Sequence, residues 1–364
     1  MKITSVSASC HHIPVEVPHR TDPLWRDLAC VYVDTDEGIS GFGLTSVMSH
    51  FAVREYVVRV LGPFLLGKDP MNTERLWHEM FREFTLQATT GIITCAISAV
   101  DTALWDIKGK AMDTPIYRLL GGYADHVCVY ATFGLLSYSR EELASIGQSL
   151  VDAGFSMLKM VVGIDGGTNL KEDEARVRAL RKAVGDNVHI MVDANKTFNR
   201  MQATELAGRL TPYNISWFEE PVEHNDVAAL AELRGRTSIP IAAGQQEGMR
   251  WRHRDLIVAN SIDISQTDVA LVGGFSEAVK VAHFAQAYDL PVTTNGYNCP
   301  HVNMHFVGAM SNGWLVELHG LGEGLSRTVF LDPPAASDGV IALPEGPGLG
   351  MGINYEALSH YEDA

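Results

Sequence analysis

The sequence predicts an α/β protein: a modified (β/α)-barrel with an α+β capping domain. Three observations predict it. Strands precede helices in the first 120 residues, short apolar runs alternate with amphipathic helices from residue 127 onward, and polar residues end successive runs. The chain has 364 residues, 46% of them hydrophobic, which suits two units because single cores stop growing at roughly 250–300 residues. We expect a capping domain at 1–125, a barrel at 126–330 and a returning segment at 331–364.

The composition indicates which partners and which cellular compartment are compatible with the protein. A net charge of −16 argues against nucleic acid, because phosphate binding needs clustered Lys and Arg. The five cysteines form no CxxC pair, which suits a reducing compartment. The start lacks a signal-peptide pattern, and no apolar run approaches about 18 residues. These features predict a cytoplasmic protein without a membrane span.

The first 120 residues read as a sheet followed by helices. Residues 2–12 show a weak alternation of apolar and polar side chains, which is typical of a strand. The apolar run 28–33, followed by Asp36-Glu-Gly38, is typical of one strand of a hairpin and its turn. From residue 48 the pattern becomes helical, with apolar residues at helical spacing from Ala96 to Ile107 and Pro115 beyond them. Strands and helices separated in this way predict an α+β lid.

From residue 127 strands and helices alternate. Ser139-Arg-Glu-Glu142 predicts a capping box at the start of a helix. Apolar runs predict strands at 157–162, 188–192, 215–218, 239–243, 262–264, 292–294 and 314–318, with helices such as 203–210 and 276–288 between them. This number of βα units favours a parallel barrel, while a doubly wound sheet stays open as the competing fold.

Polar residues end successive strands at intervals of 23 to 27 residues, which is about one βα unit: Asp193, Glu219, Gln245, Asp268 and Asn295. In a barrel these side chains would meet at the mouth where active sites lie. Any one of them could instead cap the following helix. Two carboxylates and an amide oxygen suit a hard cation such as Mg²⁺. Lys159 is costly to bury unpaired, so we expect it to face the same polar mouth.

Three stretches carry a resemblance to a known family. The first runs from Ala96 to Lys110, AISAVDTALWDIKGK, and is followed by PIYRLLGG at 115–122. The second is Val192-Asp193-Ala-Asn195 ahead of Trp217-Phe-Glu-Glu-Pro221, and the third is the order of the later strand ends. Across almost the whole chain the sequence resembles the mandelate racemase and muconate lactonizing enzyme family of the enolase superfamily. The resemblance implies that residues 1 to about 125 and the C-terminal segment form the capping domain together. It also implies that loops around 19–25 and 47–50 close over a substrate.

The resemblance also implies a Mg²⁺ site. The family's metal ligands fall on Asp193, Glu219 and Gln245, where the third is normally Glu. Glutamine keeps an oxygen ligand but removes a charge. Glu247, two residues further on, could substitute for Gln245 or stand behind it.

The acid-base positions depart from the family pattern. The family's Lys-x-Lys reads Lys159-Met-Val161, and the family's Asp-His pair reads Asp268 with Asn295, so both usual bases are missing. Lys159 is either the base or a fixed cation for the substrate carboxylate, and Asp268 is either a base or an anchor. Glu317 matches a position that hydrogen-bonds the developing enolate oxygen. The catalytic candidates are Lys159, Asp268, Asn295, Tyr297, His301 and Glu317, and the substrate-binding candidates are His19, Arg20, Trp25, His50 and Asn195.

The first hypothesis is a Mg²⁺-dependent enzyme that dehydrates a small hydroxy-carboxylate, a sugar acid or its lactone, through a metal-stabilised enolate. One acid-base residue can serve a β-elimination, whereas racemisation needs a base on each face. A lactone cycloisomerase, or a racemase or epimerase with an unusual base, is the second hypothesis. The third is a catalytically idle relative that binds a ligand. The resemblance implies a homo-oligomer, dimer or octamer, with a small carboxylate as its ligand.

Overall fold

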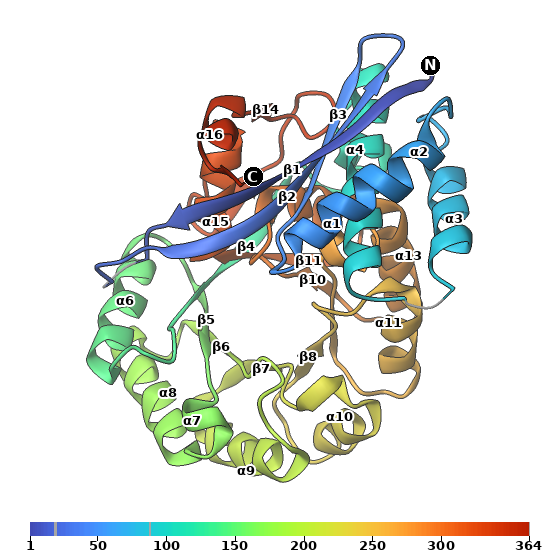
Figure 1. The fold of residues 1–364 in the computed structure, drawn as a ribbon. Coiled ribbons are helices and arrows are strands. Elements are labelled where there is room, and N and C mark those ends of the chain that lie inside the picture. The colour runs from blue at the N-terminus through green and yellow to red at the C-terminus, as the bar shows by residue number, and fades with distance from the viewer. Residues whose placement is uncertain (18–19, 87–88, 364) are drawn as a thin grey trace.

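The computed structural model describes residues 1–17, 20–86 and 89–363. Within them, a small antiparallel sheet with its helices lies across one end of a closed parallel barrel (Figure 1). The predicted capped (β/α)-barrel is therefore confirmed, and the doubly wound alternative is excluded because the last barrel strand pairs with the first. In these residues no helix combines the length and apolar character that crossing a membrane requires.

The capping sheet has the strand order β15-β1-β2-β3 within the described residues. Its strands are β1 (Ile3–Val15), β2 (Leu24–Thr35), β3 (Ser40–Thr45) and the terminal β15 (Glu362–Asp363). The helical part comprises α1 (His50–Tyr56), η1 (Val57–Leu61), α2 (Gly62–Leu65), α3 (Thr73–Phe84), α4 (Ile92–Ala111) and α5 (Ile116–Leu119). Strand β3 lies directly on α4, and a Cβ atom at Gly43 would stand 1.8 Å from the carbonyl oxygen of Ala99. Only glycine permits this approach.

The barrel strands pair in sequence order, and β11 closes the ring on β4. They are β4 (His126–Phe133), β5 (Met157–Val161), β6 (His189–Asp193), β7 (Ile215–Glu219), β8 (Ile241–Ala243), β9 (Ile264–Gln266), β10 (Val292–Thr294) and β11 (Gly313–His319). Buried side chains led by Tyr130 and Trp217 form a cluster of barrel-strand residues, so the barrel is packed and not a pore. The active-site cavity must therefore lie at its mouth.

The barrel helices follow their strands as the apolar spacing predicts. Ser139 caps the first of them, and the predicted capping box with Glu142 is present. The helices are α6 (Arg140–Asp152), α7 (Ile164–Gly167), α8 (Leu170–Val184), α9 (Arg200–Leu210), η2 (Thr211–Tyr213), η3 (Glu223–Asn225), α10 (Val227–Arg234), α11 (Met249–Val258), α12 (Val269–Val272), α13 (Phe275–Gln286), α14 (Pro300–Ala309) and α15 (Gly320–Val329).

The C-terminal segment contacts both units. It contains β12 (Phe330–Leu331), β13 (Val340–Ala342), β14 (Gly352–Ile353) and α16 (Tyr355–His360) before β15. Strand β13 pairs antiparallel with the start of β4, whereas β15 pairs with β1 in the cap. The carboxylate of Asp106 in α4 accepts hydrogen bonds from the amides of Phe42 and Leu349, each at 2.9 Å. The segment therefore helps to fix the cap over the barrel.

Candidate active site

A cavity of about 550 Å³ opens at the carboxyl ends of the barrel strands. In-register pairing places Asp193 beside Glu219 and Val161 beside Asp193, so the strand ends reach one level. The polar wall of the cavity includes Asp193, Asn195, Gln245, Gln246, Asn295, Tyr297, Glu317 and His319. The apolar wall of the cavity includes Leu135, Leu136, Val161 and Leu321. A neighbouring hollow of about 280 Å³ shares Gln246, Asn295 and Tyr297 and extends to Ser46, Val47 and Met48 of the cap.

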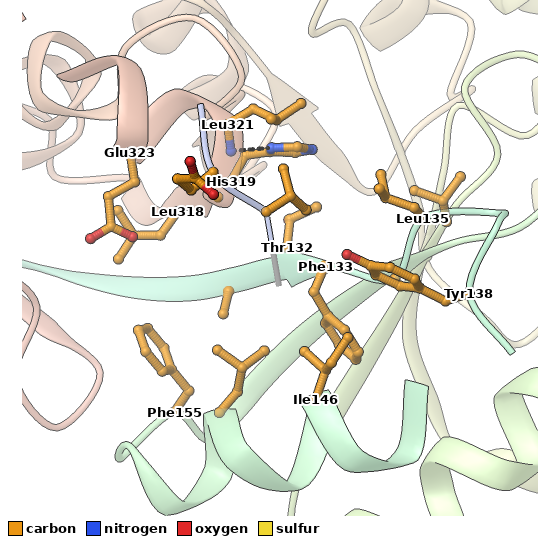
Figure 2. A pocket seen from close by; sticks show the side chains of 17 residues that line it. Thr132, Phe133, Leu135, Tyr138, Ile146, Phe155, Leu318, His319, Leu321 and Glu323 are labelled. Atoms are coloured by element: carbon orange, nitrogen blue, oxygen red, sulfur yellow. Dashed lines mark hydrogen bonds between the residues drawn. The ribbon is translucent and has the colours of Figure 1, made fainter. Parts of the chain in front are cut away.

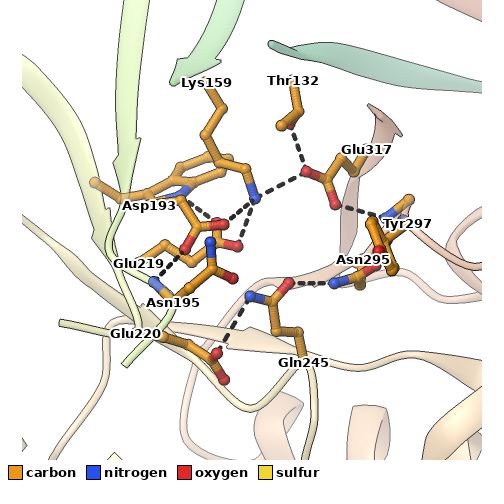
Figure 3. Close-up of polar contacts among 12 residues, drawn as sticks. Thr132, Lys159, Asp193, Asn195, Glu219, Glu220, Gln245, Asn295, Tyr297 and Glu317 are labelled. Carbon is orange, nitrogen blue, oxygen red and sulfur yellow. Dashed lines mark hydrogen bonds and ion pairs between the residues drawn. The ribbon is translucent and has the colours of Figure 1, made fainter. Parts of the chain in front are cut away.

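Lys159 is surrounded by three carboxylates beneath the cavity (Figure 3). Its Nζ lies 2.5 Å from Glu219 Oε1, 2.9 Å from Glu317 Oε1 and 3.3 Å from Asp193 Oδ2. The side chain is fully buried. Burial and the neighbouring Asp193 raise the pKa of Glu219 well above its ordinary value, although Lys159 opposes this shift. With all three carboxylates ionised the cluster has a formal charge of −2, which a divalent cation would balance.

The electrostatics of this cluster keep Lys159 charged. Burial disfavours the ammonium, but the carboxylates of Glu219 and Glu317 outweigh burial and raise the pKa of Lys159 above its ordinary value. Burial likewise disfavours the Glu317 carboxylate, but Lys159 beside it lowers the pKa of Glu317 overall. In the protein without a bound cation, Lys159 is therefore protonated and Glu317 is ionised.

The carboxylates are fixed by further donors. Asp193 Oδ1 accepts from the amide of Asn195 at 2.9 Å, and Glu219 Oε2 accepts from the indole nitrogen of Trp217 at 3.0 Å. Glu317 accepts from the amide of Gly296 at 2.6 Å and from the hydroxyl of Thr132. Buried charges that are paired and hydrogen-bonded in this way hold a single geometry.

Gln245 lines the cavity, whereas Glu247 does not. The Gln245 amide accepts from Asn295 Nδ2 through Oε1 and donates to Glu220 through Nε2 at 3.3 Å. The carboxylate of Glu247 accepts from Arg252 Nε and Asn225 Nδ2, each at 3.0 Å. Of the two residues that the sequence left open as the third ligand, Gln245 is the one that faces the site.

The donor set suits a hard divalent cation. Asp193 and Glu219 both direct a carboxylate oxygen at the point where Lys159 Nζ stands. The Gln245 carbonyl oxygen gives one lone pair to Asn295 and retains a second. Within the described ranges, no three His, Cys, Asp or Glu side chains are grouped to hold a metal. A Mg²⁺ site here would thus comprise two carboxylates and one amide oxygen.

Asp268 stands behind the cavity wall. Its carboxylate accepts from the Ala270 amide at 2.9 Å, from Asn303 Nδ2 at 3.1 Å and from Asn298 Nδ2. Burial raises the pKa of Asp268 to about 6 although these bonds oppose it. Asn303 also donates to the carbonyl of Asn295 at 2.7 Å. This geometry supports the anchoring alternative, since both carboxylate oxygens are already occupied.

His301, expected as a catalytic residue, faces away from the site. Its Nε2 bonds the carbonyl of Pro334 at 2.8 Å, and the ring lines neither hollow. The residue is 2% exposed because α14 packs its face against the segment that follows the barrel. Tyr297 does line the cavity, with its ring 3.4 Å beneath the guanidinium of Arg26.

Three of the four cap residues expected to bind substrate, Arg20, Trp25 and His50, lie outside the cavity lining. Trp25 is 53% exposed and stacks on His12 at 4.5 Å, and His50 is buried between Asp27 and Asp363. Neither these two nor Arg20 lines the cavity, and His19 lies outside the described residues. Asn195 lines the cavity as expected. Successive residues of a strand face opposite sides, so Trp25 points outward and the buried Arg26 inward.

Several cavity residues are not among the sequence candidates: Thr132, Leu135, Leu136, Gln246, His319, Leu321 and the cap residue Ser46. Val47 and Met48 also line the neighbouring hollow, and they belong to the 47–50 loop that the resemblance places over a substrate. The sequence does contain a signal that could have identified His319 as a cavity residue. It follows Glu317 by two residues on the same strand, so the strand period places it on the same inward face.

A closed parallel barrel with acidic strand ends at its mouth, beneath an α+β cap, defines a capped-barrel protein with an oxygen-rich site. Residues 2–121 match the mandelate racemase / muconate lactonizing enzyme N-terminal domain, and residues 142–358 match the enolase C-terminal domain-like model. The chain belongs to the mandelate racemase / muconate lactonizing enzyme family, as the sequence motifs predict.

Relatives of known activity are similar over nearly the full length. Arabinonate dehydratase of Saccharolobus solfataricus is 31% identical over 92% of this chain and 91% of its own. A 3,6-anhydro-alpha-L-galactonate cycloisomerase of Streptomyces coelicolor is 32% identical over 91% of this chain and 90% of its own. The crystal structure of the 3,6-anhydro-D-galactonate cycloisomerase from Zobellia galactanivorans matches with a TM-score of 0.91 at 31% identity, covering both chains fully. A Streptomyces coelicolor racemase with bound magnesium matches with a TM-score of 0.91 at 30% identity, over 99% of this chain and 100% of that one.

Proposed function

We propose that this protein is a Mg²⁺-dependent enzyme that dehydrates a small hydroxy-carboxylate, a sugar acid or its lactone, through an enolate. The observation that carries the proposal is the cluster of Asp193, Glu219 and Glu317 around Lys159 beneath the cavity. Removing a proton next to a carboxylate creates additional negative charge, and catalysis requires fixed positive charge where it develops. Relatives that dehydrate sugar acids support the same chemistry.

Asp193, Glu219 and Gln245 would hold the cation. When bound, Mg²⁺ supplies positive charge that stabilises the enolate and offsets the carboxylates around Lys159. Offsetting those carboxylates weakens the interaction that raises the Lys159 pKa, so the amine form becomes accessible. An ionised carboxylate only accepts hydrogen bonds, so Glu317 accepts from a substrate hydroxyl and keeps Lys159 in place.

Lys159 carries the proton in this scheme. As an amine it takes the proton from the carbon next to the carboxylate, and the electron pair forms the enolate. The enolate then expels the β-hydroxyl, and the Lys159 ammonium returns the proton so that water leaves. The resulting enol becomes the 2-keto acid. One residue thus serves both proton transfers.

A cycloisomerase is the second candidate, and two observations favour it. Relatives at 29–32% identity include cycloisomerases that act on galactarolactone and anhydrogalactonate. Tyr297 lines the cavity as a second group that can carry a proton. With His301 directed at Pro334, this alternative depends on Tyr297. A racemase or epimerase would likewise need a second base on the opposite face.

The test is incubation of the protein with Mg²⁺ and a panel of aldonates, aldarates and their lactones in deuterated water. A dehydratase gives a keto acid that has lost one water, whereas a cycloisomerase gives a product of unchanged mass with a different ring. Lys159→Ala should abolish turnover while the ligand-induced rise in melting temperature remains. Lys68→Ala, at a cap lysine that pairs with Glu79 and lines neither hollow, is the control. An idle relative would show ligand binding and no deuterium uptake with any acid.

We further propose a cytoplasmic location, assembly as a homo-oligomer, and domain boundaries at 1–125, 126–330 and 331–364. Strand β13 pairs with the barrel and β15 with the cap, which supports treating the last segment as a connection between the two units.

A further inference from the structure

His319 is held in one tautomer by the helix that it caps. It ends β11 and precedes α15, and its Nδ1 accepts a hydrogen bond from the Leu321 amide at 3.1 Å. A ring nitrogen that accepts an N–H carries no proton itself. The neutral imidazole therefore carries its proton on Nε2.

Two buried histidines of the barrel have the opposite arrangement to the half-buried His319. His301 and His305 direct Nε2 at backbone carbonyls, of Pro334 at 2.8 Å and of Leu349 at 3.0 Å. Their Nε2–H groups are thus already satisfied. Nε2 of His319 has no hydrogen-bond partner in residues 1–17, 20–86 and 89–363, and its ring lines the cavity. No group in these ranges accepts from Nε2, so this donor is available to a ligand that enters the cavity.

The ring is fixed from its other side as well. Tyr297 meets it edge to face, with centroids 5.3 Å apart, and Arg26 clamps Tyr297 from above. His319 also borders a second hollow of about 150 Å³ with mainly apolar walls that include Phe155 and Ile146. In Figure 2 the Nδ1 edge faces Leu321, and the opposite edge points away from Phe155 and Ile146.

The charged neighbours leave the ring neutral. Burial lowers the pKa of His319 to about 4, and Lys159 and Arg26 act in the same direction while Glu317 and Asp193 oppose them. Near neutral pH the ring therefore offers one uncharged N–H in a fixed direction.

We propose that His319 is a specificity-determining residue that donates its Nε2–H to a neutral oxygen of the substrate, a hydroxyl or ring oxygen away from the carboxylate. This inference rests on the proposed function. An uncharged donor on one wall and an acidic cluster below distinguish the two ends of a polyhydroxy acid. A substrate that lacks this oxygen displaces water from the N–H and leaves it unpaired in the complex, so it binds less tightly.

The first measurement needs no turnover. Nitrogen NMR of the Mg²⁺-loaded protein, assigned with His319→Gln, should show Nε2–H, a bare Nδ1, and no titration from pH 5.5 to 8. An Nδ1–H tautomer or a titration in this range overturns the proposal.

The second measurement compares His319→Gln, whose amide keeps a donor near Nε2, with His319→Leu, which has none. The probe is whichever acid of the panel raises the melting temperature most with Mg²⁺. We expect Leu to weaken binding and kcat/KM by about 10–100-fold and Gln by only a few-fold. His305→Gln is the control for loss of a buried imidazole. Equal losses in the Gln and Leu variants, or none, overturn this inference alone. If no acid binds wild type, the proposed function falls together with it.

Discussion

Replacing Lys159 with Met tests the acidic cluster through stability, without any substrate. The substitution removes an ammonium that contacts carboxylate oxygens at 2.5, 2.9 and 3.3 Å inside a fully buried site. Removing one partner of a buried ion pair typically costs about 3–5 kcal/mol. With an unfolding entropy of roughly 2 cal/mol/K per residue over 364 residues, this loss lowers Tm by about 4–7 °C.

The assay is thermal unfolding of Lys159→Met and wild type in EDTA and in Mg²⁺. We expect the full deficit in EDTA and a smaller one in Mg²⁺, because a bound divalent cation restores positive charge among the carboxylates. Lys68→Met is the control: its ammonium lies 2.7 Å from Glu79, and the two side chains are 28% and 30% exposed, so the loss should stay below about 1 kcal/mol. Equal melting of Lys159→Met and wild type in EDTA, or a deficit that Mg²⁺ enlarges, would refute the charge argument.

Three further predictions concern single positions. Gln245→Glu places a second carboxylate against Glu220, so it should melt lower in EDTA and bind Mg²⁺ more tightly by calorimetry; unchanged affinity would exclude residue 245 as a ligand. The His305 pKa is about 4 in the folded protein and roughly 6.5 unfolded, so its contribution to stability is lost as pH falls from 6.5 toward 4; His305→Gln should lose about 2–3 kcal/mol less than wild type between pH 7 and 4.5 in urea titrations, and equal losses would contradict this. Gly43→Ala should cost about 3 kcal/mol or more because its Cβ meets the Ala99 carbonyl, whereas Gly208→Ala on the open side of α9 should gain up to about 1 kcal/mol; similar urea midpoints would contradict the packing.

The barrel could be predicted because its βα units recur at a regular spacing in the sequence. From β6 to β10 a polar residue stands at the strand end or within two residues of it, about one βα unit after the previous one. Parallel pairing brings such ends to one rim, as the register of Asp193 with Glu219 confirms. The position of Lys159 followed from the cost of burying an unpaired cation, which left the acidic rim as its nearest partner.

The cap contacts could not be predicted in the same way. Which face of β2 meets the barrel depends on how two units dock, and that placement puts Arg26 inward and Trp25 outward. His50 resembled a ligand-binding residue until packing placed it between Asp27 and Asp363. The role of His301 depended on which face of α14 receives the returning segment. In each case a contact distant in sequence decides the outcome.

The contacts of Asp106 indicate the order in which the parts of the capping domain come together during synthesis. Its carboxylate binds amides at positions 42 and 349, so the lid contains both early and late residues. Because translation proceeds from the N-terminus, the first 125 residues leave the ribosome well before the stretch that completes their sheet and occupies this carboxylate. The capping domain is thus the first part of the chain to be synthesised and the last to be completed.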